Sequence, residues 1–146
     1  MNETMPADLA SAISSEPMWL QHWISVLVVV NMAAILFIVR KNSEGKLRPR
    51  TEAFVILASM MAAGIFMSWL YEQVGYVRLL GLAHIVFWLP VFVWLAVKFR
   101  RGEFSGPFKY YLILYFVIDG ASLAIDTADV VRYLAGDRQA LHLRHQ

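Results

Sequence analysis

Four long apolar runs dominate this sequence and restrict what it can fold into. A helix that crosses the hydrocarbon core of a bilayer needs roughly 20 apolar residues, because each residue adds about 1.5 Å of rise. The runs cover residues 18–39, 53–74, 77–97 and 108–131, and each reaches this length. The sequence therefore predicts an all-α integral membrane protein with four transmembrane helices.

The amino-acid composition favours the same class of protein. Hydrophobic residues make up 59% of the 146 residues and charged residues only 16%, whereas soluble domains contain about 45–50% apolar and about 25% charged residues. A water-soluble chain of this length could not bury so much apolar surface in one core. The chain contains no cysteine, which excludes disulfides, thiolate metal sites and thiol nucleophiles.

The predicted helices are joined by short connections at residues 40–51, 75–76 and 98–107. Short connections make consecutive helices antiparallel neighbours, which predicts an up-and-down four-helix bundle. The transmembrane domain then covers residues 18–134.

The transmembrane domain is flanked by an N-terminal segment, residues 1–17, and a C-terminal tail, residues 135–146. Residues 6–16 are compatible with a short helix lying at the membrane interface or with a tail that lacks regular structure.

Basic residues predict how the bundle is oriented. Positively charged connections stay in the cytoplasm, and nine of the 13 Lys and Arg residues gather at the first and third connections. Both termini are then expected on the outer side, which is the periplasm if the protein resides in a bacterial inner membrane. The N-terminal segment carries no basic residue and so does not look like a signal peptide. The nine residues are Arg40, Lys41, Lys46, Arg48, Arg50, Lys98, Arg100, Arg101 and Lys109.

The fourth run carries three acidic residues, Asp119, Asp126 and Asp129. A charged residue inside a membrane costs about 2.5–3.5 kcal/mol on insertion scales, so these residues are functional candidates. At about 100° per residue the three carboxylates fall on one side of a helix. That side forms a polar stripe that faces the bundle interior or a partner chain. The stripe comprises Tyr111, Tyr115, Asp119, Ser122, Asp126 and Asp129.

The opposite side of the same run carries Gly120, Ala124 and Ala128. Small residues at this spacing allow close helix packing.

Two further ionisable residues, Glu72 and His84, lie in the outer half of their runs. For three of these ionisable residues, a structural role is an alternative to a functional one. Asp129 could pair with Arg132, Glu72 could pair with Arg78, and His84 could be a neutral histidine bonded to a carbonyl. Asp119 and Asp126 have no basic residue within one turn.

The stripe favours a protein that binds or conducts cations, either protons or metal ions. A single four-helix bundle is narrow, so conduction would require a homo-oligomer with the fourth helices arranged as acidic rings around an axis. The predicted cation-binding residues are Tyr115, Ser122, Asp119, Asp126, Asp129, Glu72 and His84.

Two alternatives remain open. One is a membrane metal or cofactor site, for which His84, Asp119, Asp126 and Glu72 are the candidate metal ligands. Haem is disfavoured, because only two histidines fall within the runs. The other alternative is a non-catalytic small subunit of a larger membrane complex.

Enzymatic activity is not expected, because the sequence contains no P-loop, H-E-x-x-H or G-x-S-x-G motif. A net charge of +2 gives no indication of nucleic-acid binding.

Overall fold

The structure is a computed structural model that describes residues 6–138. The start of the predicted N-terminal segment and most of the predicted C-terminal tail lie outside this range. The described part is mostly helical. Its α-helices are α1 (Leu9–Ser14), α2 (Met18–Met32), α3 (Thr51–Val74), α4 (Leu82–Arg100) and α5 (Gly106–Leu134). A 3₁₀ helix, η1 (Ala33–Phe37), continues α2, and another, η2 (Arg78–Gly81), leads into α4.

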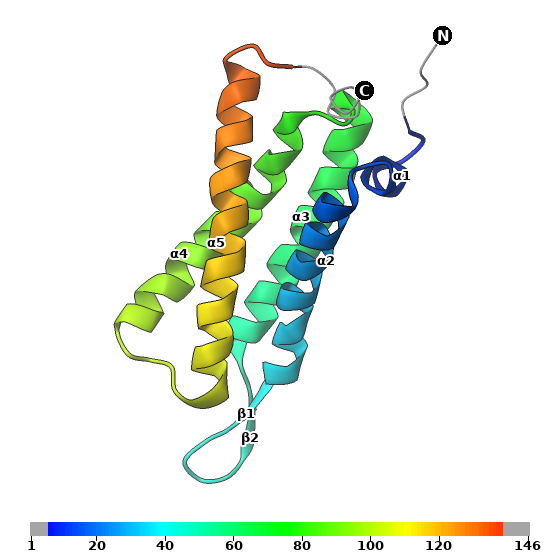
Figure 1. Ribbon diagram of the computed structural model, residues 1–146. Helices are drawn as coiled ribbons and strands as arrows, with labels where there is room; N and C mark the ends of the chain where they lie inside the picture. Colours follow the sequence, from blue (N-terminus) through cyan, green and yellow to red (C-terminus); the bar gives the residue numbers. More distant parts are fainter. Residues whose placement is uncertain (1–5, 139–146) are drawn as a thin grey trace.

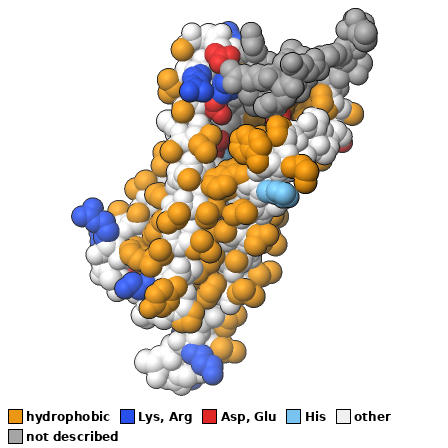
Figure 2. Space-filling model, in the orientation of Figure 1, with side chains coloured by type: hydrophobic (Ala, Val, Ile, Leu, Met, Phe, Trp, Pro, Cys, Tyr) orange, Lys and Arg blue, Asp and Glu red, His pale blue; other side chains and the backbone are white. Residues whose placement is uncertain are grey.

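Four helical segments are long and apolar enough to cross a membrane, namely Met18–Phe37, Thr51–Val74, Arg78–Arg100 and Gly106–Leu134. The predicted number of such helices is therefore confirmed, and their order along the chain agrees with the four apolar runs. Figure 2 shows hydrophobic side chains spread over the visible face of these helices, with Lys and Arg near the ends.

The four long helices run alternately up and down (Figure 1). Helix α3 packs against α4, and α4 packs against α5. Helix α2 contacts both α3 and α5 and completes the bundle. The connection between η1 and α3 marks one end of the bundle, called the hairpin end below. Helix α1 and the last turns of α5 lie at the other end, called the α1 end.

The first connection contains a β-hairpin, which the sequence does not predict. Strands β1 (Val39–Lys41) and β2 (Leu47–Pro49) are antiparallel, with Arg40 opposite Arg48. The side chain of Asn42 accepts a hydrogen bond from the backbone N–H of Lys46 at 2.9 Å, which closes the turn. The first predicted run therefore ends earlier than expected, since Val39 belongs to a strand.

Helix α1 folds over one end of the bundle. The Asp8 carboxylate accepts a hydrogen bond from the backbone N–H of Ser11 at 2.7 Å and caps the helix. This bond lowers the pKa of Asp8. Ala12 is buried against the bundle, and the Tyr71 hydroxyl of α3 donates a hydrogen bond to the Pro6 carbonyl at 2.6 Å. Residues 6–14 are thereby fixed beside the last turns of α3.

The hairpin end of the bundle is filled by large aromatic side chains. Phe108 and Tyr111 of α5 pack against Phe37 of η1, with ring centroids 5.4 and 5.0 Å from it. Phe104 packs on Phe108, and Leu95 of α4 is completely buried in the same cluster. This half of the interior is therefore apolar and closely packed.

The small residues of α5 do not all pack within the bundle. Gly120 lies against Phe92, since a Cβ atom at residue 120 would be 3.3 Å from the Phe92 ring. Ala124 and Ala128, however, are exposed. Of the three small residues, only Gly120 packs against another helix of the bundle.

Candidate functional site

A cavity of about 340 Å³ lies within the half of the bundle nearest α1, and it is partly open. Its volume falls in the range of about 300–1,000 Å³ that is usual for small-molecule sites. Leu9 and Ile13 of α1 lie over it, and α2 and α3 contribute mainly apolar side chains. Its polar lining is concentrated on α5 and on the segment that leads into α4. Those polar residues are Tyr76, Arg78, His84, Ser122, Asp126 and Asp129.

His84 of α4 and Asp126 of α5 form the central pair of this cavity. Nδ1 of His84 lies 2.7 Å from Oδ2 of Asp126, and each side chain is only 17% exposed. The Ser122 hydroxyl donates to the same carboxylate oxygen at 3.3 Å. The His84 ring is stacked on Trp88, with centroids 4.0 Å apart. The partner of His84 is thus a carboxylate rather than a backbone carbonyl, and stacking on Trp88 fixes the plane of its ring.

The close approach of α5 to the start of α4 depends on Gly81. A Cβ atom at residue 81 would lie 2.9 Å from Oδ1 of Asp126 and 3.1 Å from its Cα. The second contact is with backbone, so a side-chain rotation could not relieve it. Glycine at this position therefore allows Asp126 to reach the His84 ring.

Arg78 of η2 is the buried cation of the site, with a side chain that is 4% exposed. It forms a salt bridge with Asp129 and a second one with Asp137, whose Oδ2 lies 3.2 Å from the guanidinium Nε. Two of the suggested pairings are therefore wrong. Arg132 is exposed and is not the partner of Asp129 in the structure, and Glu72 does not reach Arg78.

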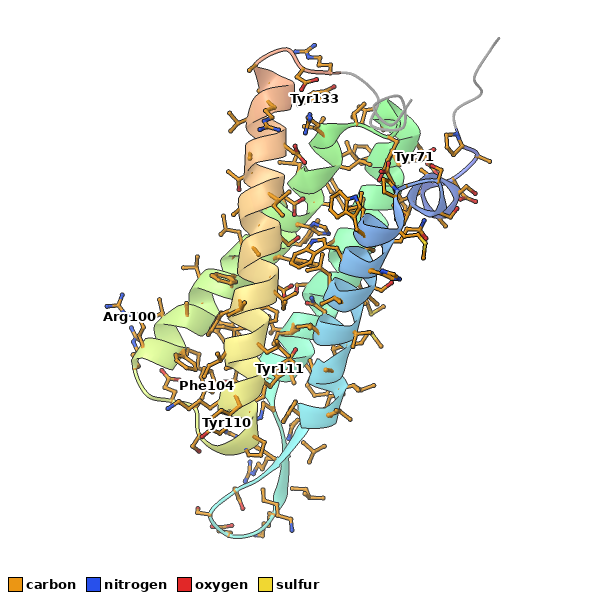
Figure 3. All side chains as sticks on the ribbon, in the orientation of Figure 1. Tyr71, Arg100, Phe104, Tyr110, Tyr111 and Tyr133 are labelled. Atoms are coloured by element: carbon orange, nitrogen blue, oxygen red, sulfur yellow. The ribbon has the colours of Figure 1, made fainter. Side chains whose placement is uncertain are left out.

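Asp119 occupies the middle of the bundle and is completely buried. Its Oδ1 accepts a hydrogen bond from Nδ2 of Asn31 on α2 at 2.7 Å. Below it, the Tyr111 hydroxyl donates to the Val30 carbonyl at 3.0 Å, and Figure 3 shows Tyr111 pointing from α5 toward α2. The Tyr115 hydroxyl is buried and has no hydrogen-bond partner among residues 6–138. Asp119 is thus held by an amide and does not line the cavity.

The polar stripe of α5 faces the interior of its own bundle. Tyr111, Tyr115, Asp119 and Ser122 are all buried against the other helices, and Asp126 and Asp129 are partly buried. The sequence had left open whether this stripe faces the bundle or a partner chain. The structure places these side chains inward, toward the other helices of the same bundle.

Glu72 lies apart from the other predicted site residues. It is exposed and borders a separate shallow hollow, together with Ser68 and Trp69. Within the described part of the chain, no three His, Asp or Glu side chains are placed to hold a metal ion. Of the candidate metal ligands, only His84 and Asp126 are in direct contact.

Three residues of the site are not predicted from the sequence. Asn31 lies well inside the first run, and an amide at that depth indicates a polar partner on another helix. Trp88 looked like an ordinary apolar residue. Tyr76 was assigned to a turn, but it is buried, and this burial, together with the nearby Glu16 carboxylate, raises the pKa of its phenol.

The acidic side chains around the cavity differ in the cations that pair with them. Arg78 is shared by two carboxylates, those of Asp129 and Asp137. Asp126 has only His84 as a potentially cationic partner among the described residues, and His84 is charged only when it holds a proton. The charge of Asp126 is therefore balanced only when a proton or another cation is present.

We found no match for this chain to any family model, to any curated protein or to any solved structure.

Proposed function

We propose that this chain is a multi-pass membrane protein that binds a cation in the cavity between α2 and α5. Asp126 is the anionic ligand, and His84 is the partner that gives up its proton when the cation binds. The observation that carries this proposal is a contrast in how the carboxylates of the cavity are paired. Arg78 is already matched by Asp129 and Asp137, whereas Asp126 lies 2.7 Å from a histidine whose charge is variable.

The outer surface of the helices supports a location in a membrane. Each long helix exposes bulky apolar side chains, such as Val29 (65% exposed), Ile65 (70%), Val93 (52%) and Val117 (62%). Isolated apolar side chains are common on soluble proteins, but a continuous apolar surface on all sides of a bundle favours lipid.

The basic residues support an orientation for the bundle. The β-hairpin and the connection between α4 and α5 carry most of the Lys and Arg residues at the hairpin end. Because basic connections stay in the cytoplasm, we place this end inside and the α1 end outside. The cavity then faces the outer side, which is the periplasm in a bacterial inner membrane.

The packing of the two halves supports binding from the outer side rather than passage through one bundle. Phe104, Phe108 and Tyr111 fill the hairpin half with aromatic rings, and the cavity does not extend into it. Conduction by an assembly of several copies, with homo-oligomers as the functional unit, stays a prediction.

Binding should be coupled to protonation of His84. The Asp126 carboxylate contacts this ring, and the buried Asp119 interacts with it electrostatically. Tyr76, Arg78 and Asp129 line the same cavity. Helices α1, α2 and α3 add no titratable side chain to the cavity. A proton on His84 and a bound cation both neutralise Asp126 and repel each other. Cation affinity should therefore increase as the pH rises and His84 loses its proton.

The test is calorimetric titration of the purified protein in detergent with Na⁺, K⁺, Mg²⁺, Mn²⁺ and tetramethylammonium. Asp126→Asn should abolish the binding seen with the wild type, because it removes the charge and keeps the shape. Glu72→Gln is the matched control, since it makes the same change at an exposed carboxylate outside the cavity. Failure of every cation to bind at any pH, or equal binding by Asp126→Asn, would overturn the proposal.

A further inference from the structure

The size and lining of the cavity indicate what kind of cation it takes. Its volume of about 340 Å³ is roughly ten times the share of one water molecule, about 30 Å³, and far exceeds a bare ion. Inorganic cations such as Mg²⁺ and Ca²⁺ require several oxygen ligands. The cavity offers oxygen atoms at one side only, and no group of three metal-ligating side chains lies within residues 6–138. A metal ion is therefore a poor fit.

The apolar part of the lining lies opposite the carboxylates. Asp126 and Asp129 belong to α5, whereas α2 and α3 contribute aliphatic and sulfur-containing side chains. Trp23 and Trp88 also line the cavity, and indole rings attract organic cations by about 0.5–2 kcal/mol. A molecule with a cationic group at one end and an apolar body at the other would match this arrangement.

Two unpaired hydrogen-bond donors belong to residues that line the cavity. Nε1 of Trp88 and Nη2 of Arg78 are buried and have no hydrogen-bond partner in the described part of the chain. Both residues line the cavity, and each is only 5% exposed. Buried donors are normally paired. An ether, ester or hydroxyl oxygen of a bound molecule would give them an acceptor.

We infer that the cavity binds an amphiphilic organic monocation, with an ammonium group at Asp126, an apolar body against α2 and α3, and an acceptor oxygen near Trp88 or Arg78. This inference rests on the proposed function, because it requires that Asp126 bind a cation. An ammonium group also occurs in lipid head groups. The cavity is too small for the two acyl chains of a phospholipid, so we assign it to a free small molecule.

The test uses benzoylcholine, which carries a quaternary ammonium, an ester and an aromatic ring and has no titratable proton. Its neutral isostere, 3,3-dimethylbutyl benzoate, has the same shape without the charge. Binding is measured by calorimetry in nanodiscs made of phosphatidylglycerol, which contains no ammonium. We expect the wild type and Glu72→Gln to bind benzoylcholine at least about tenfold more tightly than the isostere, a difference of about 1.4 kcal/mol.

Two variants and one measurement of proton release probe the parts of the site. Asp126→Asn should remove the preference for benzoylcholine over its isostere. Trp88→Phe should weaken benzoylcholine binding several-fold, because it keeps an aromatic ring and removes the N–H donor. Titrations in two buffers with different ionisation enthalpies should show that the wild type releases protons when it binds at acidic pH. Equal affinity for the two isosteres, or no effect of Asp126→Asn, would overturn the inference.

The outcomes also separate this inference from the function on which it rests. Binding of a metal ion that requires Asp126, without binding of benzoylcholine, would leave the proposed function standing and refute the organic ligand. Absence of all cation binding would refute both. Benzoylcholine binding that is lost when phosphatidylethanolamine is added to the nanodiscs would identify the lipid amine as the occupant and overturn assignment to a free molecule.

Discussion

Nδ1 of His84 lies 2.7 Å from Oδ2 of Asp126, which joins α4 to α5 across 42 residues of sequence. The bond brings together the titratable histidine and the carboxylate that line one side of the cavity. This contact, rather than the row of acids along α5, is the centre of the proposed site.

Replacement of His84 by Gln should make cation affinity nearly independent of pH. In the wild type, a proton on His84 and a bound cation compete for Asp126, so we expect cation affinity to rise with pH. Glutamine cannot carry a charge, so the affinity of His84→Gln should change little with pH. Calorimetric titration at several pH values checks the prediction. A variant that keeps the wild-type pH dependence would show that another group titrates.

Asp119 and Asn31 should behave as an acid–amide pair. Nδ2 of Asn31 donates to Oδ1 of Asp119, while Oδ1 of Asn31 and Oδ2 of Asp119 have no hydrogen-bond partner within residues 6–138. If Asp119 is protonated at Oδ2, that hydroxyl donates a hydrogen bond to Oδ1 of Asn31, and both atoms gain a partner. Asp119→Asn supplies an N–H in the same place, so it should fold with a melting temperature close to that of the wild type.

Asp119→Ala is the contrasting variant, because it leaves the buried Asn31 side chain with only its hydrogen bond to the Leu27 carbonyl. We expect it to lower the free energy of unfolding by about 1–3 kcal/mol, measured by thermal unfolding in detergent. If Asp119→Asn were as unstable as Asp119→Ala, the charge of Asp119 rather than its hydrogen bonding would be what stabilises the bundle.

Loss of Arg78 should destabilise the α1 end. Arg78→Gln leaves Asp129 and Asp137 without their common cation. Because these carboxylates are 26% and 35% exposed, water compensates in part, and we expect a loss of about 1–3 kcal/mol. Arg132→Gln is the control, since Arg132 is exposed one turn from Asp129. Similar melting temperatures for the two variants would contradict the assigned pairing.

Gly81→Ala should displace Asp126. The added Cβ atom would meet the backbone of Asp126 at 3.1 Å, and such overpacking costs about 1–3 kcal/mol. Both the melting temperature and cation affinity should fall. Gly64→Ala is the matched control for the melting temperature, because a Cβ at residue 64 has no atom within 4 Å. Equal behaviour of the two alanine variants would mean that α4 and α5 separate easily.

The orientation can be tested with single cysteines, since the natural chain has none. Ser14→Cys places a thiol on α1, and Ser43→Cys places one in the hairpin connection, and both positions are exposed. In intact bacterial cells, a membrane-impermeant maleimide should label Ser14→Cys and should label Ser43→Cys only after the cells are broken open. The reverse pattern would place the hairpin end outside and the cavity inside.

The sequence by itself determined the number, order and approximate positions of the long helices. These depend on continuous apolar runs and on charged connections, which are local properties of the chain. It also identified Asp126 and His84 as residues that need a partner, since an ionisable side chain in an apolar run is costly wherever it points. The hairpin was missed, because its basic residues resemble those of any surface loop.

Only the tertiary structure decided which residues meet. Asp129 and Glu72 each had a basic residue nearby in the sequence, yet Arg78 pairs with Asp129 and Asp137. The amide of Asn31 and the carboxylate of Asp119 are 88 residues apart and hydrogen bond across the bundle. Such pairs depend on how the helices are rotated about their axes, and this rotation is set by close packing, as at Gly81. A hydropathy pattern fixes where a helix runs but leaves that rotation open.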